Sequence, residues 1–110
     1  MPTPRPVIVD AQALVHQYDA NKLAAQQRYT GKVVQTTARI TNISSVLGQA
    51  YIVLEPAHDD TFTLTPINCN FDSQTPLLSL QNGQQVTVRG TMQDMSWAVI
   101  TMEHCALVGR

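Results

Sequence analysis

The chain has 110 residues, a net charge of -1, a pI of about 6.2 and 44% hydrophobic residues. This length suits one domain with a single modest core. Seven basic residues against eight acidic ones exclude a general attraction for the phosphate backbone of nucleic acid. No apolar run approaches the roughly 20 residues of a membrane-spanning helix, which excludes that class of membrane protein.

The first residues are rich in proline, which discourages helix. We therefore expect an extended tail at residues 1–9 and a single domain at residues 10–110. The opening from Met1 to Pro6 is too short and too polar for a signal peptide. If the natural protein has a leader, this start is typical of a trimmed linker, and the periplasm or cell envelope is the expected location. Otherwise the expected location is the cytoplasm.

One helix is expected after the tail, at residues 11–28. Asp10 is a favourable N-cap, and the segment contains neither Pro nor Gly. Gly31 is expected to end the helix region. We expect this helix to lie on a sheet or to close one end of a barrel.

Five β-type segments follow, identified by alternating apolar and polar residues. They are expected at residues 32–43, 50–55, 61–71, 84–92 and 98–108. A break in the alternation predicts a bulge near Thr41–Asn42, and Pro66 predicts a bulge or an edge position. A short helical turn is expected at residues 77–80. The residues expected to be buried are Val34, Ile40, Leu54, Leu64, Val86, Val88 and Ile100.

The order of these segments is strand, strand, strand, short helix, strand, strand. It is the order of the five-stranded Greek-key barrel called the OB fold, which binds oligonucleotides or oligosaccharides. A small β-sandwich or a helix-packed α+β sheet would give a similar pattern. The predicted fold class is all-β, a five-stranded OB-fold barrel with one N-terminal helix.

Several segments also carry a resemblance to a known family. They are Tyr18-x-x-Asn21, Tyr29-x-Gly31-Lys32, Asn68-Cys69-Asn70-Phe71, the run from Leu80 to Gly90, and Glu103-His104-Cys105-Ala106-Leu107. Together they resemble the bacterial tRNA-anti-like OB-fold family, which includes candidate lipoproteins of the cell envelope. The resemblance covers roughly residues 10–108. It implies nucleic-acid binding by analogy of fold alone, and it implies no catalytic residues.

Cys69 and Cys105 are the only cysteines, and each falls at an inward position of an apolar strand. The third and fifth strands are neighbours in the OB topology, so their Cα atoms can reach the roughly 4.4–6.8 Å that a disulfide requires. The sequence predicts this disulfide, which an envelope location would favour. The alternative is two small buried hydrophobic residues. A metal site is disfavoured because His104 points away from Cys105 and no CxxC pair exists.

No catalytic constellation is evident in the sequence. His16, His58 and His104 fall on a helix, a turn and a strand, without the nucleophile and orienting partner that a catalytic histidine needs. The run from His58 to Asp60 is typical of a solvated acidic turn. We expect no catalytic residue, no metal and no cofactor.

The ligand face of an OB fold centres on its second and third strands. Here that face is expected to carry Tyr51, Val53, Glu55, Thr61, Thr63 and Thr65. Among the aromatic residues, Tyr51 and Trp97 in the last loop are the expected stacking side chains for a base.

Basic residues near this face are few. Lys32, Arg39 and Arg89 fall on neighbouring strands and could form a small basic stripe for phosphates. The alternative interpretation is that they are solvated outward positions. Leu47 could join Met95 and Trp97 in an exposed apolar patch for a protein partner, or these side chains could cap the barrel.

The sequence therefore predicts a non-enzymatic OB-fold binding module with a protein-interaction role at the bacterial cell envelope. Single-stranded nucleic-acid binding is the alternative, and its affinity is expected to be weak. The ligand and the protein partner are not identified by any motif.

Overall fold

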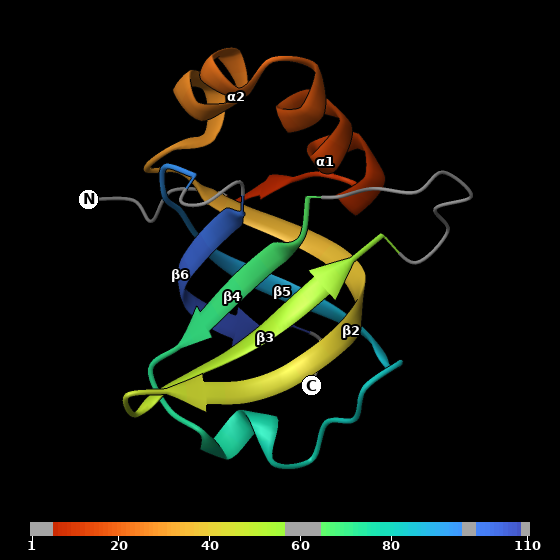
Figure 1. Ribbon diagram of the computed structural model, residues 1–110, viewed down its shortest axis with the longest axis vertical. Helices are drawn as coiled ribbons and strands as arrows, with labels where there is room; N and C mark the ends of the chain where they lie inside the picture. Colours follow the sequence, from red (N-terminus) through yellow and green to blue (C-terminus); the bar gives the residue numbers. More distant parts are fainter. Residues whose placement is uncertain (1–5, 57–64, 96–98, 109–110) are drawn as a thin grey trace.

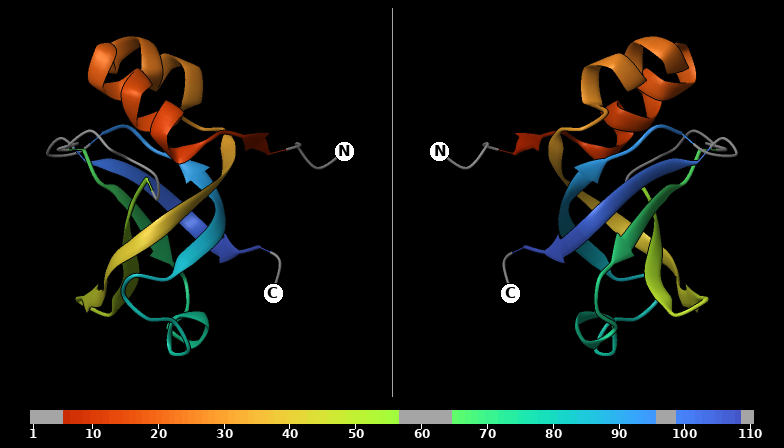
Figure 2. Two further views of the ribbon diagram at one scale, coloured as in Figure 1. Left: turned by 90° about the vertical axis from the view of Figure 1, so that its right-hand side faces the viewer. Right: turned by 90° about the vertical axis from the view of Figure 1, so that its left-hand side faces the viewer.

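The computed structural model describes residues 6–56, 65–95 and 99–108. A closed β-barrel forms its centre, and two helices cover one end of the barrel (Figures 1 and 2). The elements in chain order are β1 (Val7–Ile8), α1 (Ala11–Ala20), α2 (Lys22–Tyr29), β2 (Val33–Val46), β3 (Gln49–Glu55), β4 (Ile67–Phe71), the 3-10 helix η1 (Thr75–Leu77), β5 (Gln85–Met92) and β6 (Ile100–Leu107).

The barrel strands follow the order β2-β3-β4-β6-β5, and β5 returns to pair with β2. β4 and β6 are parallel, whereas the other pairs within this ring are antiparallel. This closed order is that of the five-stranded Greek-key barrel, so the predicted fold is confirmed. The sandwich and α+β alternatives fail because the pairing of β5 with β2 closes the five strands into one ring.

β2 is long enough to pair with two neighbouring strands along different parts of its length. Residues 33–39 pair with β5, and residues 39–46 pair with β3. The register shifts between Ile40 and Asn42, which confirms the bulge predicted near Thr41–Asn42. A bulge bends its strand and increases the local twist, so β2 can turn from one side of the barrel to the other.

Part of the predicted tail belongs to the sheet. β1 pairs in parallel with β2, with Val7 opposite Val34 and Ile8 opposite Gln35. The backbone N–H of Val9 donates to the carbonyl of Gln35 at 3.0 Å. β3 reaches β2 only from residue 39 onward, so β1 satisfies backbone groups that the first half of β2 would otherwise leave unpaired.

The prediction of one helix at residues 11–28 is wrong, because two helices occupy this segment. Asn21 lies between them with an extended backbone, at φ -161° and ψ 98°. Its side chain accepts a hydrogen bond from the N–H of Ala24 at 3.1 Å, and its own N–H donates to the carbonyl of Gln17 at 3.1 Å. One residue therefore ends α1 and begins α2.

The break in the helical segment brings two aromatic rings together. Tyr18 and Tyr29 stack with centroids 6.2 Å apart and are both buried against the barrel. The predicted N-cap is confirmed, since Asp10 accepts from the N–H of Ala13 at 3.2 Å.

The core fills the barrel and continues under the helices. Six of the residues predicted to be buried are buried: Val34, Ile40, Leu54, Val86, Val88 and Ile100. Leu64 lies outside the described residues. The third strand is described from Ile67, and the predicted helical turn begins earlier than expected because Pro76 favours its first turn.

Candidate ligand groove

A groove of about 510 Å³ lies on the outer face of β3 and β4. Its lining residues are Val46, Gln49, Tyr51, Val53, Pro66, Asn68, Asn70 and Val99. The pairing of the two strands sets Tyr51 opposite Asn70 and Val53 opposite Asn68. Residues opposite each other in an antiparallel pair share a face, so one ring, one aliphatic side chain and two amides form the centre of the groove.

Hydrogen bonds orient the two amides. Asn68 Nδ2 donates to Asn70 Oδ1 at 2.9 Å, and Asn70 Nδ2 donates to Glu103 Oε1 on β6 at 3.0 Å. An amide side chain has two donor hydrogens and an acceptor oxygen with two lone pairs. Both Asn residues therefore keep hydrogen-bonding capacity for a ligand while their positions are fixed.

The predicted basic stripe is not part of this groove. Arg39 makes an ion pair with Glu55, the residue opposite it on β3. Arg89 lies on β5, on the far side of β2, and its guanidinium donates to Gln35 Oε1 at 3.0 Å. Lys32 is exposed just before β2. The structure therefore places Tyr51 apart from these three cations.

The remaining ligand-face predictions have mixed outcomes. Trp97, Thr61 and Thr63 lie outside the described residues. Thr65 does not belong to the face, because it is buried and its hydroxyl donates to Asp19 of α1 at 2.5 Å. Packing of α1 over this end of the barrel explains the difference.

The groove amides were not among the predicted ligand-face residues, because the binding of bases and phosphates calls for aromatic rings and positive charges. The signal was present in the run from Ile67 to Phe71, where two Asn residues alternate with three apolar ones. This alternation places Asn68 and Asn70 on the outer face.

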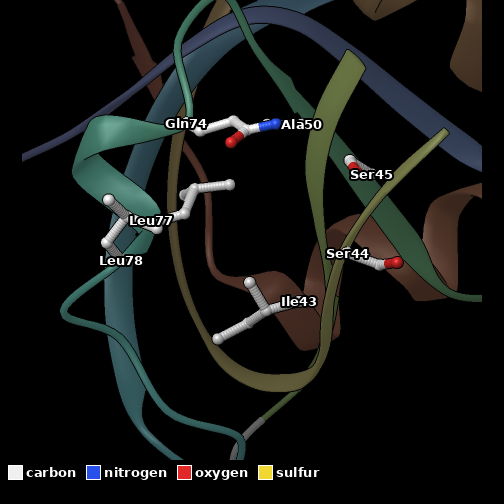
Figure 3. A pocket seen from close by; sticks show the side chains of 7 residues that line it. All are labelled: Ile43, Ser44, Ser45, Ala50, Gln74, Leu77 and Leu78. Carbon is white, nitrogen blue, oxygen red and sulfur yellow. The ribbon is translucent and has the colours of Figure 1, made fainter. Parts of the chain in front are cut away.

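The β2–β3 hairpin ends in an exposed apolar tip. We use the name hairpin pole for Val46 and Leu47 of this tip together with Leu78, which follows η1. These residues are 56%, 101% and 78% exposed, respectively. Beneath the hairpin pole lies a cavity of about 250 Å³ between the hairpin and η1, into which Ile43 and Leu77 extend (Figure 3).

The predicted patch of Leu47 with Met95 is wrong. Met95 follows β5 near the start of β2, and its N–H donates to Gln26 Oε1 of α2 at 2.9 Å. Leu47 lies at the opposite end of β2.

The two cysteines are free and buried in this structure. Cys69 Sγ lies 3.8 Å from Met102 Sδ, and Cys105 Sγ donates to the carbonyl of Met102 at 3.6 Å. A hydrogen bond with Cys105 and burial raise the pKa of Cys69 well above its usual value. The predicted disulfide is therefore not formed here, although the two thiols are neighbours.

The histidines do not converge. His16 is exposed on α1, and His58 lies outside the described residues. His104 Nδ1 lies 3.1 Å from Asp72, and this hydrogen bond, with the carboxylate charge, raises the pKa of His104. Within the described ranges, no three His, Cys, Asp or Glu side chains gather as metal ligands. No helix in the same ranges is long and apolar enough to cross a membrane.

Comparison with known proteins identifies the family. The model of the tRNA_anti-like family matches residues 4–106. None of the curated proteins matches the chain.

Solved structures resemble the fold. A candidate nucleic acid-binding lipoprotein from Klebsiella pneumoniae subsp. pneumoniae aligns with a TM-score of 0.74 at 20% identity, over 94% of this chain and 92% of that one. A chain of the S. pombe Stn1–Ten1 complex has a TM-score of 0.53 at 13% identity, over 71% and 59%. RecG bound to a three-way DNA junction has a TM-score of 0.55 at 15% identity, over 98% of this chain and 13% of that chain. At these identities the likeness shows the fold alone.

Proposed function

The chain belongs to the tRNA_anti-like family, and from this premise we propose a non-enzymatic OB-fold binding module that holds an extended segment of a protein partner in its β3–β4 groove. One observation carries the proposal: the groove lining formed by the described residues consists of apolar side chains, amides and one tyrosine, and none of these residues is charged. An uncharged groove favours an uncharged ligand backbone.

The chemistry of the groove suits a polypeptide. Asn68 and Asn70 can both donate to and accept from peptide groups. Tyr51 offers an apolar ring with a polar hydroxyl, a combination that is frequent at protein interfaces. The groove opens at one end toward Val46 of the hairpin pole, so a bound segment could extend onto an apolar surface. The Stn1–Ten1 complex supports the proposal, since one of its chains has this fold in an assembly of two proteins.

Single-stranded nucleic acid is the second candidate ligand. It is favoured by the fold shared with the Klebsiella lipoprotein, described as a candidate nucleic-acid binder, and with RecG bound to DNA. Electrostatics disfavour it, because Arg39 is neutralised by Glu55 and the net charge is -1. Single-strand binders combine a basic groove with several stacking rings. We therefore expect an affinity on the order of 10⁻⁴ M or weaker at physiological salt.

The cell envelope is the proposed location. The similarity to a lipoprotein over nearly the whole of both chains supports it. Expression of the native gene followed by separation of cytoplasm, periplasm and membranes tests it, and recovery in the cytoplasm alone would contradict it.

Peptide selection tests the proposed ligand class. Random linear peptides displayed on phage are selected on the immobilised protein, and each selected peptide is then measured against Tyr51→Ala and Asn68→Ala. We expect at least a tenfold loss of affinity for each variant, about 1.4 kcal/mol, because both side chains line the groove. Gln85→Ala is the matched control, since Gln85 is exposed on β5 and β2 separates it from the groove.

Fluorescence anisotropy with a labelled single-stranded oligonucleotide decides between the two ligands. Sub-micromolar binding that falls steeply with salt and weakens in Arg39→Ala or Arg89→Ala would replace the polypeptide proposal with the nucleic-acid one. Selected peptides that bind Tyr51→Ala and Gln85→Ala equally would contradict the groove as the site.

A further inference from the structure

Within the barrel, β4 and β6 pair over a short stretch only. Their ladder runs from Ile67 opposite Ile100 to Cys69 opposite Met102. β6 continues to Leu107 and β4 to Phe71 without further pairing to each other. We call the region beyond Cys69 and Met102 the β4–β6 seam. Backbone hydrogen bonds do not join the two strands there.

A bulge in β6 turns Cys105 toward the inside of the seam. The register between β5 and β6 shifts between Arg89 and Thr91, and His104 has a positive φ of 53°. Strict alternation from the buried Met102 would turn residue 104 inward and residue 105 outward. Instead His104 is exposed and Cys105 is buried.

Gly90 leaves room for the Cys105 sulfur. A Cβ atom at residue 90 would lie 2.7 Å from Cys105 Sγ, well inside van der Waals contact. Both thiols contact Met102, since Cys69 Sγ lies 3.8 Å from Met102 Sδ and Cys105 Sγ lies 3.6 Å from the Met102 carbonyl oxygen. The bulge and the glycine together therefore place the Cys105 thiol beside Met102, next to the Cys69 thiol, on the inner side of the seam.

We propose that Cys69 and Cys105 are an oxidation site, at which an intramolecular disulfide closes the β4–β6 seam. Cys105 also lines a cavity of about 460 Å³ between β6 and residues 71–79. It is 8% exposed, whereas Cys69 is fully buried. Cys105 is thus the thiol that an incoming small disulfide, such as oxidised glutathione, reaches first.

The reaction proceeds by two thiol–disulfide exchanges. The Cys105 thiolate attacks one sulfur of glutathione disulfide, which forms a mixed disulfide and releases one glutathione. The Cys69 thiolate then attacks Cys105 Sγ, which forms the protein disulfide and releases the second glutathione. Two protein thiols are oxidised, one glutathione disulfide is reduced, and the two protons end on the released glutathiones. Because the pKa of Cys69 is raised, the exchange should be faster at alkaline pH.

The test compares disulfide formation in the folded and the unfolded chain. The protein is first unfolded, so that both thiols become accessible to glutathione. One sample is then refolded and a second is kept in concentrated guanidinium, and both are equilibrated in glutathione redox buffers. Free thiols are trapped by alkylation and counted by mass. The equilibrium constant for the intramolecular disulfide is expected to be roughly several hundredfold larger in the folded chain, as expected for a bond that closes a long loop without strain.

Gly90→Ala tests the geometry independently of the ligand groove. The added Cβ displaces Cys105 Sγ, so the constant should fall in the folded chain and stay unchanged in guanidinium. Thr91→Ala, at the next residue of β5, is the matched control and should leave both constants unchanged. Equal constants in the folded and unfolded wild-type chain, or disulfides that form only between molecules, would overturn the proposal.

Discussion

Tyr18 is buried completely, yet its hydroxyl has no hydrogen-bond partner among the described residues. Burial, followed by the influence of Tyr29 and Asp94, raises the pKa of Tyr18 to about 12. An unfolded tyrosine has a pKa of about 10. As the pH rises above 10, the unfolded state therefore loses its proton first. The stability that Tyr18 contributes is complete below pH 10 and declines as the pH approaches 12.

Tyr18→Phe should preserve the free energy of unfolding at pH 7 or raise it by up to about 1 kcal/mol, because it removes an unsatisfied buried hydroxyl. The variant should also lose less stability than the wild type between about pH 10 and 11.5. Urea unfolding over a pH series measures both effects.

Tyr29→Phe is the control for this prediction. The Tyr29 hydroxyl donates to Gln17 Oε1 at 3.0 Å, so its removal should lower the free energy of unfolding by about 1 kcal/mol at pH 7. A loss of more than 1 kcal/mol in Tyr18→Phe would mean that the Tyr18 hydroxyl has a partner after all.

At the scale of elements, Asn21 decides between one helix and two. Alanine favours a continuous helix over asparagine, so a single helix would gain stability from Asn21→Ala. In the observed arrangement Asn21 is the N-cap of α2, and the same change should lower the free energy of unfolding by about 1 kcal/mol. Urea unfolding measures the sign.

Gln27→Ala is the matched control for the cap, because Gln27 is exposed within α2. It should change the free energy of unfolding by less than about 0.5 kcal/mol. A more stable Asn21→Ala would mean that α1 and α2 join into one helix in solution.

The strands were predictable because their alternation reports which face is buried. Val34, Ile40 and Val88 illustrate this, since each lies at an inward position and is buried. The break at Asn21 was not predictable in the same way, because helix propensity is local and does not report where Tyr18 and Tyr29 must meet.

The candidate site was predicted only in part. Tyr51 lies in the groove, as the position of the second OB strand implies. The ion pair of Arg39 with Glu55 was not predicted, because it depends on the cross-strand register of β2 and β3. The pairing of β1 with β2 was also not predictable from the sequence, since it depends on where β3 stops pairing with β2.

The whole molecule has two unlike ends. Residues 40–54 and 73–88, which include the hairpin pole, contain no charged side chain, whereas charged side chains occur on both helices and on the remaining barrel segments. Leu47 at the tip is fully exposed and has a positive φ of 51°. The left-handed region costs a leucine roughly 1–2 kcal/mol and suits asparagine better.

Leu47→Asn should therefore raise the free energy of unfolding by up to about 1 kcal/mol. It should also raise solubility near the pI of about 6.2, because it removes an exposed apolar side chain. Urea unfolding and polyethylene-glycol precipitation measure the two effects.

Leu78→Asn is the control for this change. Leu78 is 78% exposed but has an ordinary φ of -68°, so its replacement should raise solubility without adding stability. A loss of more than about 1 kcal/mol in Leu47→Asn would show that the tip packs against another part of the chain.

β1 and the hairpin pole lie at opposite ends of the barrel (Figure 1). Any tether attached through the backbone before β1 would hold the helices toward its anchor and point the hairpin pole outward. The length of the tether would then set the distance between the uncharged tip and the anchoring surface. A partner that approaches from the side opposite the anchor would therefore meet the hairpin pole first.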